Sequence, residues 1–312
     1  MVMKTSEAIP VGPGNLSSFL DYCATHGKAH DESFLPGPDF RPGPETPAFI
    51  LARDDGKVEG AASLLLGGSW GRAGRGRFAI LHAEGAGGSG GARDAYRNLL
   101  LASARAAEGR VRELYLFLPE TAAGTLAALE ALGFSRERVV YGMEAPILSD
   151  MPPVAPAGWT LEAVKAEDER AVMEFVEVRN RNFKEVLGAH DASAEDVRDM
   201  LRSDSALPGG LLLLRDRDGV AHGTLFLDRD DEEGVLFVGT VTVDREVRGR
   251  GLGRHLIRTA LAFGAERGFS KAFLSVNALN RSALSLYEGE GFVLERALVC
   301  LGASVDALAS LR

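Results

Sequence analysis

The chain has 312 residues, of which 46% are hydrophobic and 25% charged, a composition typical of a folded globular protein of two ordinary domains. Its formal net charge of -9 excludes nucleic acid and anionic membranes as bulk electrostatic partners, and it suits a cationic amine as a ligand. Two cysteines, Cys23 and Cys300, give no disulfide framework and fit a reducing compartment.

The start of the chain, residues 1–10, lacks the apolar segment of a signal peptide, and no apolar run reaches membrane-spanning length. We therefore expect a cytoplasmic protein with neither a membrane nor a nucleic acid as partner. Arginine outnumbers lysine and alanine is abundant, which indicates a GC-rich bacterial genome.

An internal repeat determines the expected architecture. Residues 49–56 and 211–219 are each a buried strand that enters a tight polar turn, and a second strand follows each of them. Residues 133–138 and 291–296 are also similar, and each segment follows a helix rich in alanine and leucine. The Pro-rich residues 149–158 between the copies predict an extended linker. We expect two domains, 1–151 and 152–312, forming a pseudo-dimeric pair within a monomer.

The second copy contains a strand, a glycine-rich turn and a helix. Residues 238–243 alternate as in a strand, and residues 256–263 have the periodicity of an amphipathic helix. The turn between them carries three arginines and three glycines, namely Arg248, Gly249, Arg250, Gly251, Gly253 and Arg254. Glycine lets a bulky anion approach the backbone, the helix start offers unpaired N–H groups, and arginine adds charge-assisted donors. The pattern predicts a pyrophosphate site.

Other interpretations of this turn remain open at this point. Glycine-rich turns before helices also bind dinucleotides and nucleoside triphosphates, and some are only structural. The sequence has no Gly-Lys-Ser/Thr, which argues against nucleotide hydrolysis. A dinucleotide site requires an acidic residue at the end of a strand about 20 residues further on. Glu266 and Glu288 bracket that distance, but neither ends a predicted strand.

A second motif follows the predicted strand 271–276. Asn280 is expected to cap a helix that begins at Arg281, and Gly291 is expected to end it in the left-handed conformation. Together, Arg248-x-x-Gly251-x-Gly253 and Asn280-x-x-Ala283-x-x-Leu286-Tyr287-x-x-x-Gly291-Phe292 resemble the two signatures of the GNAT superfamily of N-acetyltransferases. The resemblance covers about residues 160–300. It implies an α/β fold with a mixed sheet, present here as two tandem acyl-CoA N-acyltransferase domains.

The resemblance implies an enzyme that uses acetyl-CoA as cosubstrate and transfers its acetyl group to a primary amine of a small molecule by direct attack. Tyr287 would be the general acid, and Glu233 and His222 are candidates for the base. The residues implied to bind acetyl-CoA are Val241, Thr242, Val243, Arg248, Gly249, Arg250, Gly251, Leu252, Gly253, Arg254, Asn280, Ala283 and Tyr287. The fourth strand of the domain is expected to diverge from the fifth, leaving its backbone free for the pantetheine arm.

The first copy looks degenerate. Residues 85–93 keep glycines but lack the arginine that precedes them in the second copy, and Leu129 stands where Tyr287 is. Leucine cannot donate a proton, so we expect the first domain to be structural or to shape the substrate site, with weak acetyl-CoA binding there left open.

The acceptor is not specified by the sequence. Glu185, His190 and Asp191 lie where the superfamily commonly binds its acceptor. The tandem layout is distantly similar to that of mycothiol synthase, but residues 235–243 contain no acidic residue, so mycothiol synthesis is not assigned. A non-catalytic acyl-CoA-binding module and an antibiotic-modifying acetyltransferase are the alternatives.

Several other polar residues are expected to have structural roles and to bind no ligand. Cys23, His26 and His30 could suggest a metal site, but a helix end with polar residues accounts for them, and we expect no metal. Residues 244–246 are expected to solvate the turn, and His255 is expected to face outward from its helix.

Overall fold

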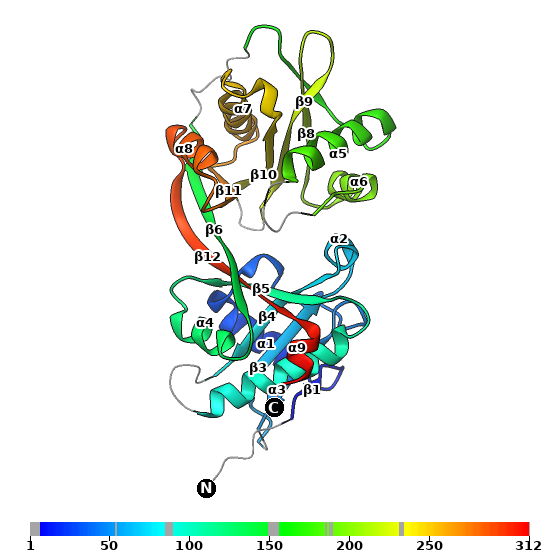
Figure 1. The fold of residues 1–312 in the computed structure, drawn as a ribbon, viewed down its shortest axis with the longest axis vertical. Coiled ribbons are helices and arrows are strands. Elements are labelled where there is room, and N and C mark those ends of the chain that lie inside the picture. The colour runs from blue at the N-terminus through cyan, green and yellow to red at the C-terminus, as the bar shows by residue number, and fades with distance from the viewer. Residues whose placement is uncertain are drawn as a thin grey trace. The chain divides into compact units, whose positions relative to one another are not determined.

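The computed structural model describes residues 7–53, 55–84, 90–148, 156–184, 186, 190–230 and 234–311 (Figure 1). The chain divides into two compact units, which are described separately. Unit 1 comprises Met1–Val139 and Ala297–Arg312, and unit 2 comprises Val140–Arg296.

Unit 1 contains a mixed sheet in the order β1-β2-β3-β4-β5-β12. Within it β4 and β5 are parallel, and the other neighbours are antiparallel. Its strands are β1 (Ile9–Pro10), β2 (Ala48–Ala52), β3 (Val58–Leu65), β4 (Arg75–Ala83), β5 (Glu113–Pro119) and the last part of β12 (Val293–Ser304).

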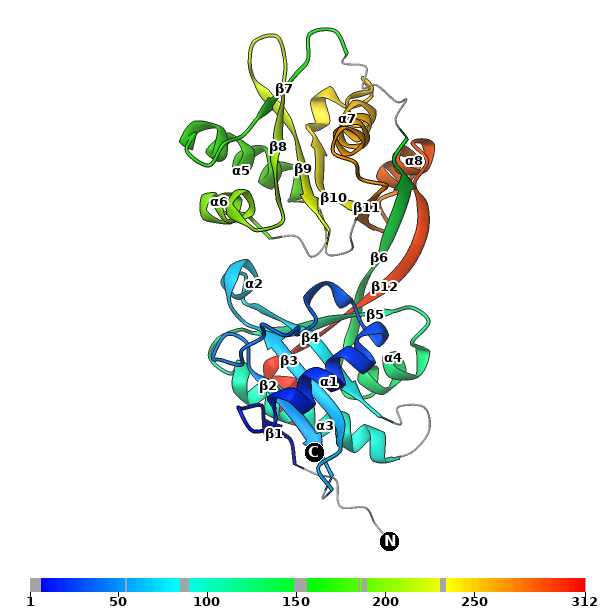
Figure 2. The same ribbon diagram turned by 180° about the vertical axis from the view of Figure 1, so that it is seen from behind.

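Helices cover both faces of this sheet, because its strands carry buried residues on both faces. Ala48 and Ile50 of β2 pack with α1 (Leu16–His26), whereas Phe49 and Leu51 belong to the opposite core. Figure 2 shows α1 lying across β3. The remaining helices of the unit are η1 (Gly27–Ala29), η2 (Glu32–Phe34), α2 (Gly68–Arg72), α3 (Gly90–Ala107), α4 (Ala123–Glu130) and α9 (Val305–Ala309).

Unit 2 repeats this plan in the order β6-β11-β10-β9-β8-β7, with β10 and β11 parallel and the other neighbours antiparallel. Its strands are the last part of β6 (Ser135–Pro146), β7 (Thr160–Ala163), β8 (Ala206–Arg215), β9 (Ala221–Arg229), β10 (Val235–Val243) and β11 (Lys271–Asn277). Its helices are α5 (Glu169–Phe183), α6 (Ala194–Arg202), η3 (Arg245–Val247), α7 (Leu252–Glu266) and α8 (Arg281–Gly289).

The sheet of unit 2 is also covered on both faces, with α5 and α6 on one side and α7 on the other (Figure 1). Leu211 and Leu213 of β8 pack under α5 and α6, and Leu212 and Leu214 pack with α7. The predicted caps of α8 are confirmed. The side chain of Asn280 accepts a hydrogen bond from the amide of Ala283, and Gly291 has φ +89°.

The two units exchange strands between the halves of the sequence. β6 begins in unit 1 and ends in unit 2, where residues 140–146 pair with β11. β12 runs the other way, and its residues 298–304 pair with β5. This division differs from a single boundary at residue 152, because a cut there would remove one strand from each sheet. The predicted linker, 149–158, lies mostly outside the described residues.

The described part of the chain contains no helix long and apolar enough to cross a membrane. Over the same residues, no group of His, Cys, Asp and Glu side chains is arranged to hold a metal ion. Cys23 and Cys300 are both buried and reduced.

Two neighbouring histidines, the buried His30 and the half-buried His82, are expected to make unit 1 sensitive to acid. Burial, with His26 close by, lowers the pKa of His82 to about 4, and burial lowers that of His30 to about 3. The unfolded chain therefore takes up protons below about pH 6.5 that the folded chain does not bind, so stability falls as the pH falls through this window.

We expect the urea midpoint of unfolding to drop between pH 7 and pH 5. His82→Asn should flatten this dependence, because asparagine cannot titrate and its side-chain amide can still hydrogen-bond the hydroxyl of Tyr22, which lies 2.8 Å from His82 Nδ1. An equal slope in the wild type and the variant would show that His82 does not cause the loss.

Candidate functional site

β10 and β11 diverge in the middle of the sheet of unit 2. Their parallel pairing joins Val235–Val238 to Lys271–Leu274 and goes no further, while β10 continues to Val243. A register shift between Val238 and Thr240 marks the point of divergence, and beyond it β10 pairs with β9 alone among the described strands. The edge of β10 around Val241 and Val243 therefore carries backbone groups that the sheet does not use.

The turn after β10 leads into the start of α7. Gly249 and Gly251 have φ +78° and +77°, a left-handed conformation that favours glycine. A Cβ atom at either position would meet no atom within 4 Å, so the space beside this backbone is open. Gly251 is the N-cap of α7 and has no side chain to occupy the first N–H groups of the helix. The turn thus presents uncapped donors to open space.

Gly253 has a different role from its two neighbours. A Cβ atom there would lie 3.0 Å from the side chain of Leu286, so this glycine lets α7 pack closely against α8.

The three arginines of the turn are held differently. Arg248 donates from Nε to the carbonyl of Val243 at 2.8 Å, and from Nη2 to Asn182 Oδ1 at 3.4 Å. Arg254 Nε lies 2.7 Å from the carboxylate of Glu290, which is buried and is also bound by Arg258. Arg250 is exposed, and no described residue pairs with it. Arg250 is therefore the arginine of this turn that is most available to an incoming anion.

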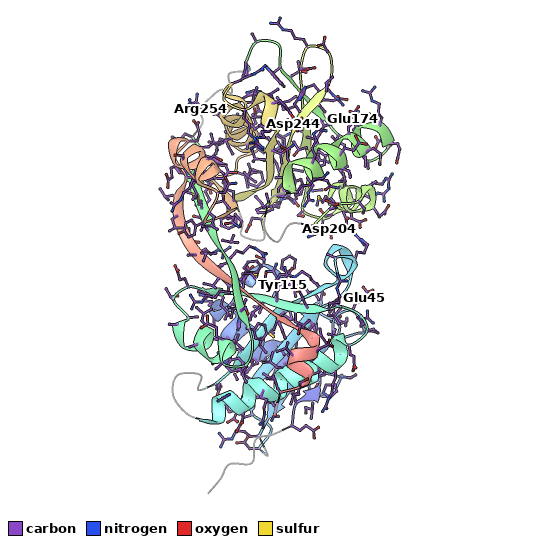
Figure 3. The ribbon with its side chains drawn as sticks, viewed as in Figure 1. Glu45, Tyr115, Glu174, Asp204, Asp244 and Arg254 are labelled. Atoms are coloured by element: carbon purple, nitrogen blue, oxygen red, sulfur yellow. The ribbon has the colours of Figure 1, made fainter. Side chains whose placement is uncertain are left out.

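Asp244, at the end of β10, corrects the prediction that residues 244–246 only solvate the turn (Figure 3). Its carboxylate is 6% exposed. It accepts hydrogen bonds from Arg181 Nε at 2.8 Å and Asn182 Nδ2 at 2.7 Å, and it lies 3.1 Å from His222 Nδ1. Burial alone would raise the pKa of Asp244, but the hydrogen bonds from Arg181 and Asn182 lower it below its ordinary value. Asp244 therefore stays ionised and joins α5, β9 and β10.

The structure describes one of the two candidate bases, His222. His222 lies between two carboxylates, with Nδ1 and Nε2 each 3.1 Å from Asp244 and Asp216, so neither nitrogen is turned toward an acceptor amine. This geometry argues against His222 as the base. Glu233 lies outside the described residues. The prediction that His255 faces outward is wrong, because its side chain is 5% exposed and lies against the core side of α7.

Two of the three predicted acceptor residues, His190 and Asp191, lie within the described residues. Glu185 lies outside the described residues. The carbonyl of His190 accepts a hydrogen bond from Arg179, and Asp191 is exposed.

Tyr287 is 8% exposed on α8, and its ring packs against Phe292 with a centroid separation of 5.9 Å. Burial raises its pKa to about 12, so the phenol keeps its proton at neutral pH. Tyr287 belongs to the same hydrophobic cluster as Val241 and Val243 on the edge of β10. In the first copy Leu129 is fully buried in the core of unit 1.

The sequence profile of the acetyltransferase (GNAT) family matches residues 172–292, which contain the diverging strands, the glycine turn and Tyr287. This part of the chain is similar to the acetyltransferase (GNAT) family. The mycothiol acetyltransferase of Kytococcus sedentarius is 33% identical over 174 residues, 54% of this chain and 57% of that protein. The one from Thermomonospora curvata is 34% identical over 174 residues, 54% of this chain and 56% of that protein. The chain thus spans about half the length of these curated relatives.

Solved GNAT structures match nearly the whole chain. A GCN5-related N-acetyltransferase from Sphaerobacter thermophilus has a TM-score of 0.69 at 20% identity, covering 96% of this chain and 95% of that one. A tandem GNAT protein from the clavulanic acid biosynthesis pathway has a TM-score of 0.67 at 18% identity, with coverage of 96% and 98%. The predicted tandem GNAT fold is confirmed by these matches.

We predict that Asp244→Ala lowers the free energy of unfolding by about 2–3 kcal/mol, because Arg181 and His222 lose a buried partner. Urea unfolding measures this. Glu246→Ala is the matched control, since Glu246 is an exposed carboxylate two residues away, and its effect should stay within about 0.5 kcal/mol. Equal effects of the two changes would contradict a special role for Asp244.

Proposed function

We propose that unit 2 binds acetyl-CoA at the turn before α7 and transfers the acetyl group to a primary amine of a small molecule. The observation that carries this proposal is the divergence of β10 from β11 beside an uncapped helix start. A free strand edge suits an amide-containing arm, and an uncapped helix start suits a pyrophosphate.

The residues present fit such a cosubstrate. The N–H groups of Leu252, Gly253 and Arg254 would bind the pyrophosphate, with Arg250 supplying charge. The backbone of Val241 and Val243 would pair with the pantetheine arm, and one of these N–H groups would polarise the thioester carbonyl. Arg248 would act indirectly, because it already holds the carbonyl of Val243 and the side chain of Asn182.

The proposed reaction is direct attack. The lone pair of the neutral amine forms a bond to the thioester carbonyl carbon, the carbon–sulfur bond breaks, and the thiolate of CoA leaves with its electrons. Water takes the proton released by the amine. Tyr287 donates its proton, or a hydrogen bond, to the sulfur. A phenol with a pKa of about 12 is a weaker acid than an ordinary thiol with a pKa of about 8.5, so its contribution should be moderate.

The acceptor is best sought among small amines. Aminoglycosides, polyamines, amino acids, peptides and mycothiol-type amines form a suitable panel, scored by release of free CoA. Release with at least one amine supports an enzyme. Binding of acetyl-CoA by calorimetry without release for any amine would instead support a non-catalytic acyl-CoA-binding module.

We predict that Gly251→Asp abolishes binding of CoA. The new carboxylate would enter the pyrophosphate position and take up the same N–H groups of α7. Calorimetry with CoA measures this. Gly268→Asp is the matched control, because Gly268 has φ +78° just beyond the other end of α7, with open space beside it. The control should lose similar stability yet keep its affinity. Unchanged affinity in Gly251→Asp would place the cosubstrate elsewhere.

We predict that Tyr287→Phe lowers kcat on the order of 10²-fold and leaves the affinity for acetyl-CoA within a few-fold. Pre-steady-state assays with the best amine of the panel measure the chemical step. Tyr141→Phe serves as control, since it removes a hydroxyl from another tyrosine of the same hydrophobic cluster, and it should keep its kcat. If the chemical step in Tyr287→Phe were as fast as in the wild type, Tyr287 would not be the general acid.

A further inference from the structure

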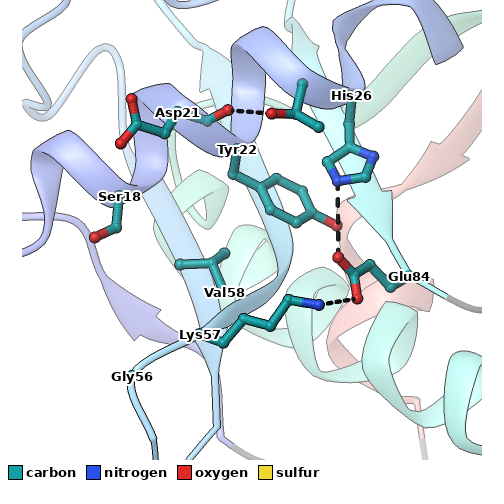
Figure 4. A pocket seen from close by; sticks show the side chains of 9 residues that line it. Ser18, Asp21, Tyr22, His26, Gly56, Lys57, Val58 and Glu84 are labelled. Carbon is teal, nitrogen blue, oxygen red and sulfur yellow. Dashed lines mark hydrogen bonds and ion pairs between the residues drawn. The ribbon is translucent and has the colours of Figure 1, made fainter.

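Unit 1 has a cleft of about 320 Å³ between α1 and the turn joining β2 to β3 (Figure 4). Tyr22 and His26 of α1 line one side, and Lys57 and Val58 line the other. Glu84, just after the end of β4, completes the lining. Neither the family match nor the proposed transfer reaction uses this cleft.

Glu84 corresponds to Asp244 of unit 2 by strand register. Gly60 pairs with Ala83 in unit 1 as Gly223 pairs with Val243 in unit 2. The amide of Glu84 donates to the carbonyl of Glu59 at 2.8 Å, and the amide of Asp244 donates to that of His222 at 2.7 Å. Glu84 and Asp244 are therefore each the first residue after the fourth strand of their copy. By the same register, Val58 corresponds to Ala221.

In unit 2 the carboxylate at this register position binds the guanidinium group of Arg181. Arg181 donates from Nε and Nη2 to the two carboxylate oxygens of Asp244, and from Nη2 to the carbonyl of Ala221 at 2.7 Å. This contact is bidentate, the geometry that a planar guanidinium makes with a carboxylate. In unit 1 the described residues that line the cleft include no arginine, and the carboxylate is still present.

We propose that the cleft of unit 1 binds a small guanidinium compound, with Glu84 as its carboxylate partner. The aromatic wall fits this class of ligand. Tyr22 and His26 line the cleft with ring centroids 4.3 Å apart, and His82, outside the lining, supports His26 by stacking on it at 4.4 Å. Planar guanidinium groups bind well to such ring faces, whereas an ammonium group gains less from them.

Lys57 competes for the same carboxylate. Its Nζ lies 3.0 Å from Glu84 Oε2, and its side chain is 57% exposed, so it can move into solvent when a ligand arrives. An exposed pair of this kind contributes little to stability. Lys57 therefore weakens the site without closing it, and its removal should strengthen binding.

Calorimetry of the full chain with methylguanidine tests the proposal, with methylamine as the matched ammonium probe. We expect saturable binding of methylguanidine that Glu84→Gln weakens about tenfold or more, as expected for loss of a charge-assisted hydrogen bond. Lys57→Ala should strengthen binding several-fold. Glu130→Gln is the control, because Glu130 is an exposed, ion-paired carboxylate that does not line the cleft, and it should bind like the wild type.

Three results would overturn the proposal, namely no binding to the wild type or to Lys57→Ala, equal affinity in Glu84→Gln and wild type, or equal affinity for methylamine and methylguanidine. Circular dichroism of each variant excludes loss of folding as the cause. The outcome is independent of acetyl transfer, since none of these residues belongs to unit 2.

Discussion

The buried carboxylate of Asp244 is the constraint on which the candidate site depends. A carboxylate removed from water must be paired, and Asp244 obtains its partners from α5 and β9. These contacts fix the end of β10, beyond the point where it leaves β11. Arg248 extends the constraint into the glycine turn by binding both Val243 and Asn182. The position of the glycine turn therefore follows from a charge network as much as from its glycines.

Local patterns could be predicted from the sequence, whereas long-range partners could not. The strand at residues 238–243, the Asn280 cap and the left-handed Gly291 each depend on a few adjacent residues, and all three are found in the structure. Arg181 and Asp244 are 63 positions apart, so no spacing rule indicates that they pair. The same holds for Gly253, whose lack of a side chain is explained by Leu286 on another helix.

The exchange of strands has a similar physical origin. A sequence repeat marks where similar segments recur, but hydrogen bonds decide which strands complete a sheet. β12 lies in the second copy of the repeat, yet its residues 298–304 pair with β5, and Val299 and Leu301 are buried in the core of unit 1. β6 gives residues 140–146 to unit 2 in the same way. The repeat was therefore a sound guide to topology and a poor guide to where one compact unit ends.

The two copies show how one backbone position acquires different uses. The residue after the fourth strand is acidic in both, and its amide makes the same hydrogen bond to the third strand. In unit 2 the carboxylate is satisfied by Arg181, which ties α5 to the strand end beside the proposed cosubstrate site. In unit 1 the carboxylate faces a cleft, and its ion-pair partners among the described residues are the exposed Lys57 at 3.0 Å and His26 at 3.8 Å. Since a fold carries no function by itself, the residues that fill this position decide whether it supports a neighbouring site or forms one.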